Sequence, residues 1–229
     1  MGLKYWDIPW QRYREVTHYN AFRGYSAALC GTGPSIRKVK QSALDSKENL
    51  LKVCLNNAFK FVEPDIWMAV DSPDSFGSQI WTKNCIKYYN NAHRDKMIDG
   101  VKARDFPNTY LYETFLVDKH SEEFTQTAPY MKFLFEGHTF SLAVGILNWL
   151  GVDTIYLMGC DLGGSNSISK EEKGSTYNLS NQKNNLKNTL DFLRFLSDGR
   201  RMSFISATPH SPLNEFLPYV SPERIGNEN

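Results

Sequence analysis

The residues of this chain best suited to chemistry follow an apolar run at 26–30, where the sequence continues as Gly31, Thr32, Gly33, Pro34 and Ser35. The apolar run predicts a short buried strand, and the glycine-rich sequence after it predicts a tight turn that opens a helix. Glycine can adopt positive φ and lets the backbone come close to a ligand, while free N–H groups at a helix start attract an anion. These residues therefore predict a site for a phosphate group. A tight turn that holds no ligand would have the same composition.

Polar residues also follow the next two apolar runs. The run at 51–55 ends at Asn56 and Asn57, and the run at 66–70 ends at Asp71. Because the carboxyl ends of parallel strands form the ligand crevice of an open sheet, we expect these residues to line one crevice with the glycine turn. Each has a simpler explanation, since asparagine is common in turns and aspartate is a frequent helix N-cap.

A second candidate cluster precedes a predicted helix at 139–150. Gly137, His138 and Thr139 lie at its start, where the positive end of the helix dipole would attract a second phosphate or a sugar oxygen. Thr139 is equally suited to a simple helix cap. His138 is the best candidate for a general base because imidazole titrates near neutral pH. His210 is the other candidate histidine, and a structural role is the alternative for His138.

Two carboxylates at the ends of different predicted strands are the candidate metal ligands. Asp71 follows the run at 66–70, and Asp161 follows a buried run at 154–158. Carboxylate oxygens are ligands that Mg²⁺ prefers, so the two residues would hold one cation on bridging phosphates if the fold brought them together. Both are also candidate catalytic residues, together with His138.

The order of the apolar runs predicts an α/β fold, with a single Rossmann-like domain whose mostly parallel sheet is flanked by helices and carries irregular insertions. We expect its core at about 24–83 and 131–218, and an insertion at about 84–130 that contains only short strand candidates. An amphipathic helix is expected at 185–197 and a final strand at 202–205.

Composition limits the classes of function. A chain of 229 residues, of which 41% are hydrophobic, can bury one substantial core, and a formal net charge of +1 gives no broad attraction for nucleic acid or an anionic membrane. With no apolar stretch long enough to span a bilayer and no signal-peptide core, we expect a cytoplasmic protein. The four cysteines lack metal-site spacing, which argues against a zinc site and a disulfide scaffold. No feature of the sequence indicates an oligomeric state.

Short motifs occur in a defined order along the chain, at 29–35, 56–57, 63–65, 137–139 and 147–161. Together they resemble a superfamily with a shared Rossmann-like core. Its members include the bacterial lipooligosaccharide sialyltransferases, the motility-accessory-factor glycosyltransferases and the archaeal hydroxymethyl-dihydropterin pyrophosphokinase. The resemblance covers roughly 26–71 and 137–217, and it implies the same α/β fold.

In the sialyltransferases of this superfamily, the glycine loop and the following asparagine hold a cytidine nucleotide, a role that the resemblance transfers to the turn at 31–35 and to Asn56. Those enzymes also place tyrosines on the nucleotide phosphate and a histidine base in the loop before the last long helix. The corresponding loop here, 175–182, contains Tyr177 but no histidine. The resemblance therefore implies a phosphate contact for Tyr177 and leaves the role of base to His138 or to a carboxylate.

The polar segment at 163–180 lies between the residues 159–161 (Gly-x-Asp) that follow the apolar run at 154–158 and this last helix. Its glycine, serine and charged residues predict a mobile loop that closes over the nucleotide and brings Tyr177 to the phosphate. A passive surface loop is the alternative.

Residues and resemblance together favour a glycosyltransferase that needs no cofactor. A nucleotide sugar would bind at the glycine turn, and a hydroxyl of a glycan or small acceptor would attack its anomeric carbon. The alternative enzyme is a pyrophosphokinase, in which Asp71 and Asp161 hold Mg²⁺ on a nucleoside triphosphate and a pterin-like alcohol attacks the β-phosphorus. A nucleotide-binding module without catalysis is the third alternative. The expected site comprises nucleotide-binding Gly31, Thr32, Gly33, Pro34, Ser35, Asn56, Asn57, Gly137, Thr139 and Tyr177, and catalytic His138, Asp71 and Asp161.

Overall fold

The computed structural model describes residues 3–7, 11–16, 18–112, 139–162 and 202–225, together with Leu190, Leu193, Arg194 and Ser197. Within these residues the main element is a nine-stranded sheet with the strand order β11-β10-β3-β4-β5-β6-β9-β1-β2. Its strands are β1 (Leu3–Asp7), β2 (Arg12–Val16), β3 (Ser26–Cys30), β4 (Leu50–Leu55), β5 (Ile66–Ala69), β6 (Ile86–Asn90), β9 (Thr109–Tyr112), β10 (Thr154–Met158) and β11 (Ser203–Ser206).

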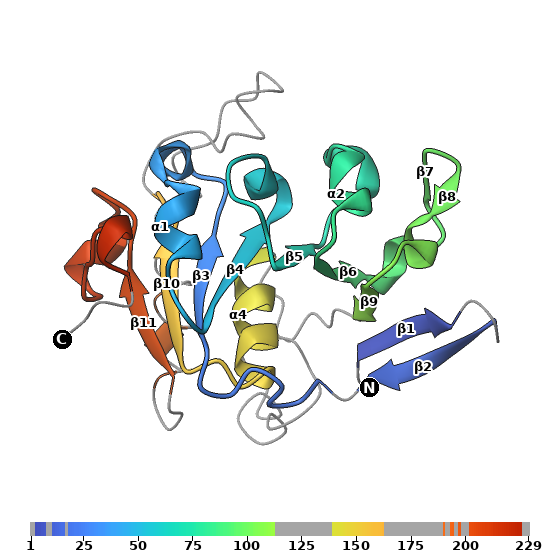
Figure 1. Ribbon diagram of the computed structural model, residues 1–229, viewed down its shortest axis with the longest axis horizontal. Helices are drawn as coiled ribbons and strands as arrows, with labels where there is room; N and C mark the ends of the chain where they lie inside the picture. Colours follow the sequence, from blue (N-terminus) through green and yellow to red (C-terminus); the bar gives the residue numbers. More distant parts are fainter. Residues whose placement is uncertain are drawn as a thin grey trace.

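The strands from β11 to β9 are all parallel, and only β1 and β2 run antiparallel to their neighbours. Figure 1 shows β11 at one end of the sheet, next to the C-terminus, and the β1–β2 hairpin at the other end, next to the N-terminus. The predicted α/β fold with a mostly parallel, Rossmann-like sheet is therefore confirmed.

The direction in which the chain adds strands reverses once, at β3. From β3 the chain adds β4, β5, β6 and β9 successively on one side, and then returns to place β10 and β11 on the other side. Adjacent strand ends whose connections leave in opposite directions create the crevice in which open α/β sheets bind ligands. That point lies between the carboxyl ends of β3 and β10, which carry the glycine turn and Asp161.

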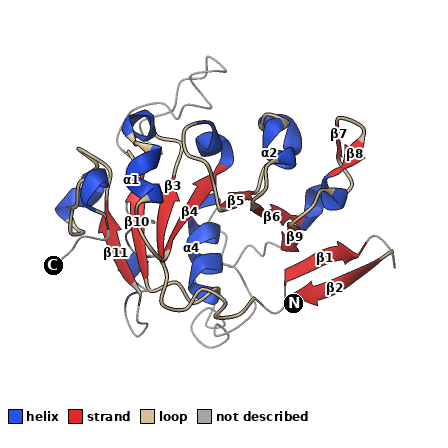
Figure 2. Ribbon diagram, in the orientation of Figure 1, coloured by secondary structure: helices blue, strands red, loops and turns tan. Residues whose placement is uncertain are grey.

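Helices and short helical turns cover the sheet on both faces. The α-helices are α1 (Gln41–Asp45), α2 (Gln79–Thr82) and α4 (Thr139–Trp149), and the 3₁₀ turns are η1 (Pro34–Lys38), η2 (Asn56–Lys60), η3 (Pro73–Ser75), η4 (Asn91–His93), η5 (Ala103–Asp105), η6 (Pro212–Glu215) and η7 (Pro222–Arg224). A separate small hairpin pairs β7 (Met97–Ile98) with β8 (Val101–Lys102). The longest described helix, α4, lies along β4 and β5 (Figure 2) and, with 11 residues, is too short to cross a bilayer.

Two hydrophobic cores lie on the opposite faces of the sheet, because successive side chains of a strand point to opposite faces. On one face Leu142 and Ile146 of α4 pack over Leu29 and Val53. On the other face α1 and α2 pack over an aromatic cluster that includes Trp67 and is fully buried. Burial on both faces explains the nearly continuous apolar sequences of β3, β5 and β10.

The structure confirms the predicted first and last residues of several elements to within one residue. The strands at 26–30 and 154–158 are observed with those limits, and α4 ends one residue before the predicted helix end. Gly151, which follows α4, has φ +84°, as expected of a glycine that terminates a helix. Of the helix predicted at 185–197, only four residues are described; all are helical, and Leu190 and Leu193 are buried.

Three parts of the fold differ from the prediction. The segment at 84–130, expected to be an insertion, contributes β6 and β9 to the main sheet, where β6 pairs in register with β5 and β9 pairs in register with β6. The turn after β3 opens a five-residue 3₁₀ turn rather than an α-helix. The hairpin formed by β1 and β2 was not predicted. The loop expected at 163–180 lies outside the described residues.

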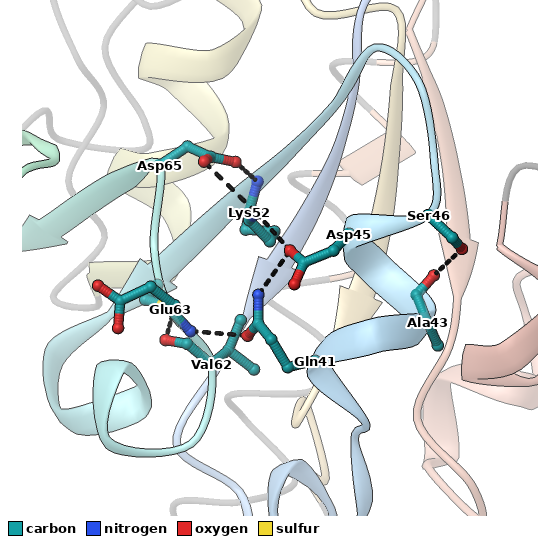
Figure 3. Close-up of polar contacts among 9 residues, drawn as sticks. Gln41, Ala43, Asp45, Ser46, Lys52, Val62, Glu63 and Asp65 are labelled. Carbon is teal, nitrogen blue, oxygen red and sulfur yellow. Dashed lines mark hydrogen bonds and ion pairs between the residues drawn. The ribbon is translucent and has the colours of Figure 1, made fainter.

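Charged side chains meet near the amino end of the sheet, where β4, β5 and β6 begin. Lys52 Nζ lies 2.7 Å from Asp45 Oδ1 and 3.6 Å from Asp65 Oδ1, and Gln41 Nε2 donates to Asp45 at 2.7 Å (Figure 3). Burial opposes the charge of Lys52, but the bonds and attraction to the two aspartates outweigh it and raise the pKa of the ammonium. This network joins α1 to the starts of β4 and β5.

Candidate functional site

The glycine turn after β3 packs directly against the exit of β10. Gly31 N donates to Met158 O at 2.7 Å, and Gly33 N donates to Gly159 O at 2.8 Å. A Cβ on Gly31 would lie 2.7 Å from Gly159 O, and a Cβ on Gly33 would lie 1.9 Å from Asp161 Oδ2. Both glycines are therefore required by the contact between the two loops. Gly33 has φ −71°, so the positive φ suggested for glycines of this turn is not needed there.

Ser35 and Asp161 form the polar centre of this contact. Ser35 Oγ donates to Asp161 Oδ2 at 2.8 Å, and Ser35 N donates to the same oxygen at 3.3 Å. The start of the turn at Pro34–Lys38 thus already faces an anion of the protein itself. Because Oδ2 receives both bonds, Oδ1 remains able to accept a hydrogen bond from a ligand.

The exit of β4 meets the start of α4. The side-chain amide of Asn56 lies 3.4 Å (Nδ2) and 3.5 Å (Oδ1) from Thr139 Oγ1, and the main-chain carbonyl of Asn56 accepts a bond from Trp67 Nε1 at 2.8 Å. Asn57 instead points to the protein interior, where it is 5% exposed and donates to Ser75 O at 3.3 Å. The structure therefore brings Asn56 and Thr139 together at the carboxyl end of the sheet and gives Asn57 a structural contact in a turn.

Asp71 lies at the exit of β5 with its side chain exposed. Its carbonyl accepts a hydrogen bond from Tyr89 Oη at 2.9 Å. Burial, followed by the charges of Asp71 and Asp74, raises the pKa of the Tyr89 phenol. The N-cap of the next turn is Ser72, so the alternative role of Asp71 as a helix N-cap is wrong.

The structure does not bring Asp71 and Asp161 together. The strands that they follow, β5 and β10, are separated in the sheet by β3 and β4, which is three strand spacings or about 14 Å. The carboxylate of Asp161 also turns toward Ser35. In the part of the chain that the structure describes, no three His, Cys, Asp or Glu residues are grouped to hold a metal ion. The two carboxylates therefore do not form the predicted site for a single shared cation.

The exit of β11 completes this end of the sheet, and from the sequence only its His210 was considered, as the alternative candidate base. Thr208 Oγ1 donates to Leu157 O at 2.9 Å and accepts from Cys160 N at 3.0 Å, while Ser211 Oγ donates to Cys160 O at 2.8 Å. These bonds fix the loop after β11 against the loop after β10. The hydroxyl-bearing residues that follow the last apolar run were the signal available in the sequence.

Positive φ angles occur at these strand exits, as they also do in other turns of the described chain, at Gln11, Asn20, Asn49, Asp99 and Asn108. Asn56 has φ 48°, Gly159 φ 61°, Leu162 φ 35° and His210 φ 59°. Leu162 is the only apolar residue with positive φ among those described, and a bulky side chain makes this conformation unfavourable. Strained backbone persists where the surrounding structure fixes it, and such positions are concentrated at functional sites.

The predicted site residues fall into three groups. The turn at 31–35 lies with Asp161, Asn56 lies with Thr139, and Asp71 lies apart from both pairs. Gly137, His138 and Tyr177 lie outside the described residues, and their roles stay predictions.

Comparisons with known proteins give one match. No protein-family model and no curated protein matches the chain. Among solved structures, the fold is similar to that of the sialyltransferase CstII from Campylobacter jejuni, in complex with the substrate analogue cytidine-5'-monophosphate. The identity is 18% and the TM-score 0.49, and the alignment covers 88% of this chain and 87% of the other.

Proposed function

We propose that this protein is a glycosyltransferase that binds a nucleotide sugar across the carboxyl ends of β10, β3 and β4. The observation that carries the proposal is the position of the Ser35–Asp161 pair, at the point where the strand order reverses. Ligands of open α/β sheets bind at this point. The sugar-transfer chemistry and the cytidine base come from the resemblance of the sequence motifs.

The charges of the site determine how the nucleotide lies in this proposal. The carboxylate of Asp161 repels a phosphate but accepts hydrogen bonds from ribose hydroxyls or a base amino group. The phosphate then lies at the other pair, where Asn56 meets Thr139 and the positive end of the α4 dipole favours an anion. The exit of β4 is two strand spacings from that of β10, or about 10 Å, a separation that a nucleotide can span.

Catalysis would rest on positioning and on stabilising the phosphate that leaves the anomeric carbon. His138, one residue before α4, is the proposed base that takes the proton of the acceptor hydroxyl, and Tyr177 is the proposed phosphate contact. Asp71 remains a second candidate carboxylate. No metal is required, and the separation of Asp71 from Asp161 removes the arrangement on which the pyrophosphokinase alternative depended.

The test is calorimetric titration of cytidine monophosphate into the full-length protein, with EDTA and then with Mg²⁺. We expect binding that does not need the metal and that weakens about tenfold in Asp161→Asn, because one charge-assisted hydrogen bond is lost. The matched control is Asp153→Asn, since Asp153 is exposed and lies at the opposite end of β10. Equal affinities for the two variants would contradict the proposed position of the nucleotide, and binding only with Mg²⁺ would contradict the metal-free transferase.

A further inference from the structure

A cavity of about 520 Å³ opens beside β11 and is lined mainly by Pro209, His210, Ser211, Pro212, Glu215 and Tyr219. This volume is within the range of about 300–1,000 Å³ that is usual for small-molecule sites. None of these residues belongs to the predicted nucleotide site. The cavity is therefore a second candidate site at the carboxyl end of the sheet.

Side-chain hydrogen bonds hold one wall of this cavity in place. Asn214 Nδ2 donates to Thr208 O at 3.1 Å, and Asn214 Oδ1 accepts a bond from Ser206 Oγ at 2.5 Å. Ser211 Oγ donates to Cys160 O at 2.8 Å. These bonds involve both polar atoms of the Asn214 side chain and the Ser211 hydroxyl, so these residues position the wall.

Another part of the lining, at Tyr219, is attached to the edge strand β11 of the sheet. Ser206 N donates to Pro218 O at 2.8 Å, and Val220 N donates to Ser206 O at 3.0 Å. Between these two bonds Tyr219 pairs with Ser206 as an isolated parallel bridge. The backbone of Tyr219 is thereby fixed, although its side chain is 48% exposed. Both parts of the lining are held by bonds within the protein, and a preformed site loses less conformational freedom when it binds a ligand.

Three functional groups of the lining are not used by the fold. Within the described part of the chain, the imidazole of His210, the carboxylate of Glu215 and the phenol of Tyr219 form no hydrogen bond or ion pair. An aromatic ring offers an apolar face with a polar end, and the carboxylate and imidazole bind hydroxyl groups. This combination suits a saccharide, whose C–H faces pack on a ring while its hydroxyls bond to polar groups.

We propose that this cavity binds the terminal residue of a neutral saccharide and is the acceptor subsite of the transferase, a role that rests on the proposed function. The location fits, because Ser211 is bonded to Cys160, the residue immediately before Asp161. The carboxylate of Glu215 selects against anionic sugars by repulsion. Tyr219 provides the stacking surface, and Glu215 and His210 bind the hydroxyls.

The test is a ligand-observed NMR titration of the full-length protein with lactose, without nucleotide. Tyr219→Ala should weaken lactose binding about tenfold because the stacking surface is removed. Phe216→Ala is the matched control, since Phe216 is equally exposed at 49%, belongs to the same segment and does not line the cavity. Equal effects of the two variants, or no binding of lactose to the wild type, would overturn the proposal.

A second pair of variants tests the selection against charge. The wild type should bind lactose in preference to sialyllactose, and Glu215→Gln should reduce this preference. The control is Glu223→Gln, which should leave the preference unchanged because Glu223 is exposed and lies outside the cavity. A preference unaltered by Glu215→Gln would overturn the proposed role of this carboxylate.

Titration of the same samples with cytidine monophosphate separates the acceptor-subsite proposal from the transferase proposal. Nucleotide binding without lactose binding overturns the acceptor subsite alone, and absence of nucleotide binding overturns the transferase and with it the acceptor role.

Discussion

The carboxyl end of the sheet is held together by backbone contacts and hydroxyl groups, whereas the amino end is held together by charged side chains. At the carboxyl end, the loops after β3 and β10 approach so closely that Gly31 and Gly33 leave no room for a Cβ. The loop after β11 is fixed to β10 through Thr208 and Ser211. The only charge within these contacts is Asp161, whose second oxygen remains available.

At the amino end, charged groups bind one another or the backbone. Lys52 lies between Asp45 and Asp65, and Lys83 forms an ion pair with Glu63. Lys87 is fully buried, and its ammonium donates to three main-chain carbonyls at 2.8, 3.2 and 3.2 Å. The ammonium of Lys87 therefore has no N–H donor left to bind a ligand.

The difference separates structural charges from candidate functional ones. Lys52, Lys83 and Lys87 have partners that account for them, whereas Asp161 and Asp71 at the other end of the same sheet retain carboxylate oxygens that no described contact uses. Stability is therefore expected to depend on charge at the amino end and on close packing at the carboxyl end.

The largest effect is expected from Gly33→Ala. The added Cβ would lie 1.9 Å from Asp161 Oδ2 and 2.6 Å from Gly159 O. The carboxylate can move aside but the backbone carbonyl cannot, so we expect a loss of about 3 kcal/mol in the free energy of unfolding, measured by urea denaturation.

Gly100→Ala is the control for this substitution. Gly100 has φ +85° but no atom within 4 Å of an added Cβ, so it adds backbone strain without a clash. We expect a loss of about 1 kcal/mol. If Gly33→Ala were no more damaging than this control, close packing would not be what holds the carboxyl end together.

The close approach at Gly33 also marks the limit of what the sequence could predict. Glycines after β3 indicated a special turn, but whether a ligand or another loop lies against them depends on Asp161, which is 126 residues after Ser35 in the chain. The strands β3 and β10 were recognised because burial on both faces leaves nearly continuous apolar runs. Long-range neighbours leave no such local signal.

The order of the strands in the sheet was the second feature that the sequence could not predict. Parallel strands bring Asp71 and Asp161 to the same end of the sheet, as expected, but their separation depends on which strands lie between them. The sequence indicated β6 and β9 as short strand candidates but did not predict that they join the main sheet. Both strands are short, and β6 contains the buried Lys87, which is tolerated because three main-chain carbonyls accept hydrogen bonds from its ammonium.

An intermediate effect is expected from Lys87→Met, which tests the amino end. The substitution keeps the volume of the side chain but leaves three buried carbonyls without their donor, so we expect a loss of about 2 kcal/mol near neutral pH. Burial lowers the pKa of the Lys87 ammonium, so the wild type should gain stability relative to the variant as the pH rises toward the usual value of 10.5. Urea denaturation of both proteins at neutral pH and near pH 10 checks the effect. A variant as stable as the wild type would show that Lys87 does not support the amino end.

The smallest effect is expected from Asp45→Asn in the network around Lys52. Asp45 is about half exposed, so its ion pair should contribute only about 0.5 kcal/mol. The bond from Lys52 lowers the pKa of this carboxyl below the usual 3.8. A lowered pKa means that the contribution of the ion pair to stability is complete above pH 3.8 and is lost as the pH falls through the folded-state pKa, because protonation removes the charge.

Denaturation midpoints of wild type and variant should therefore differ at pH 6 and converge in acid. Asp153→Asn is the control, since Asp153 is exposed and forms no described ion pair. A difference that persists in acid would mean that Asp45 acts through its shape and hydrogen bonds, and that charge is not what holds the amino end together at this position.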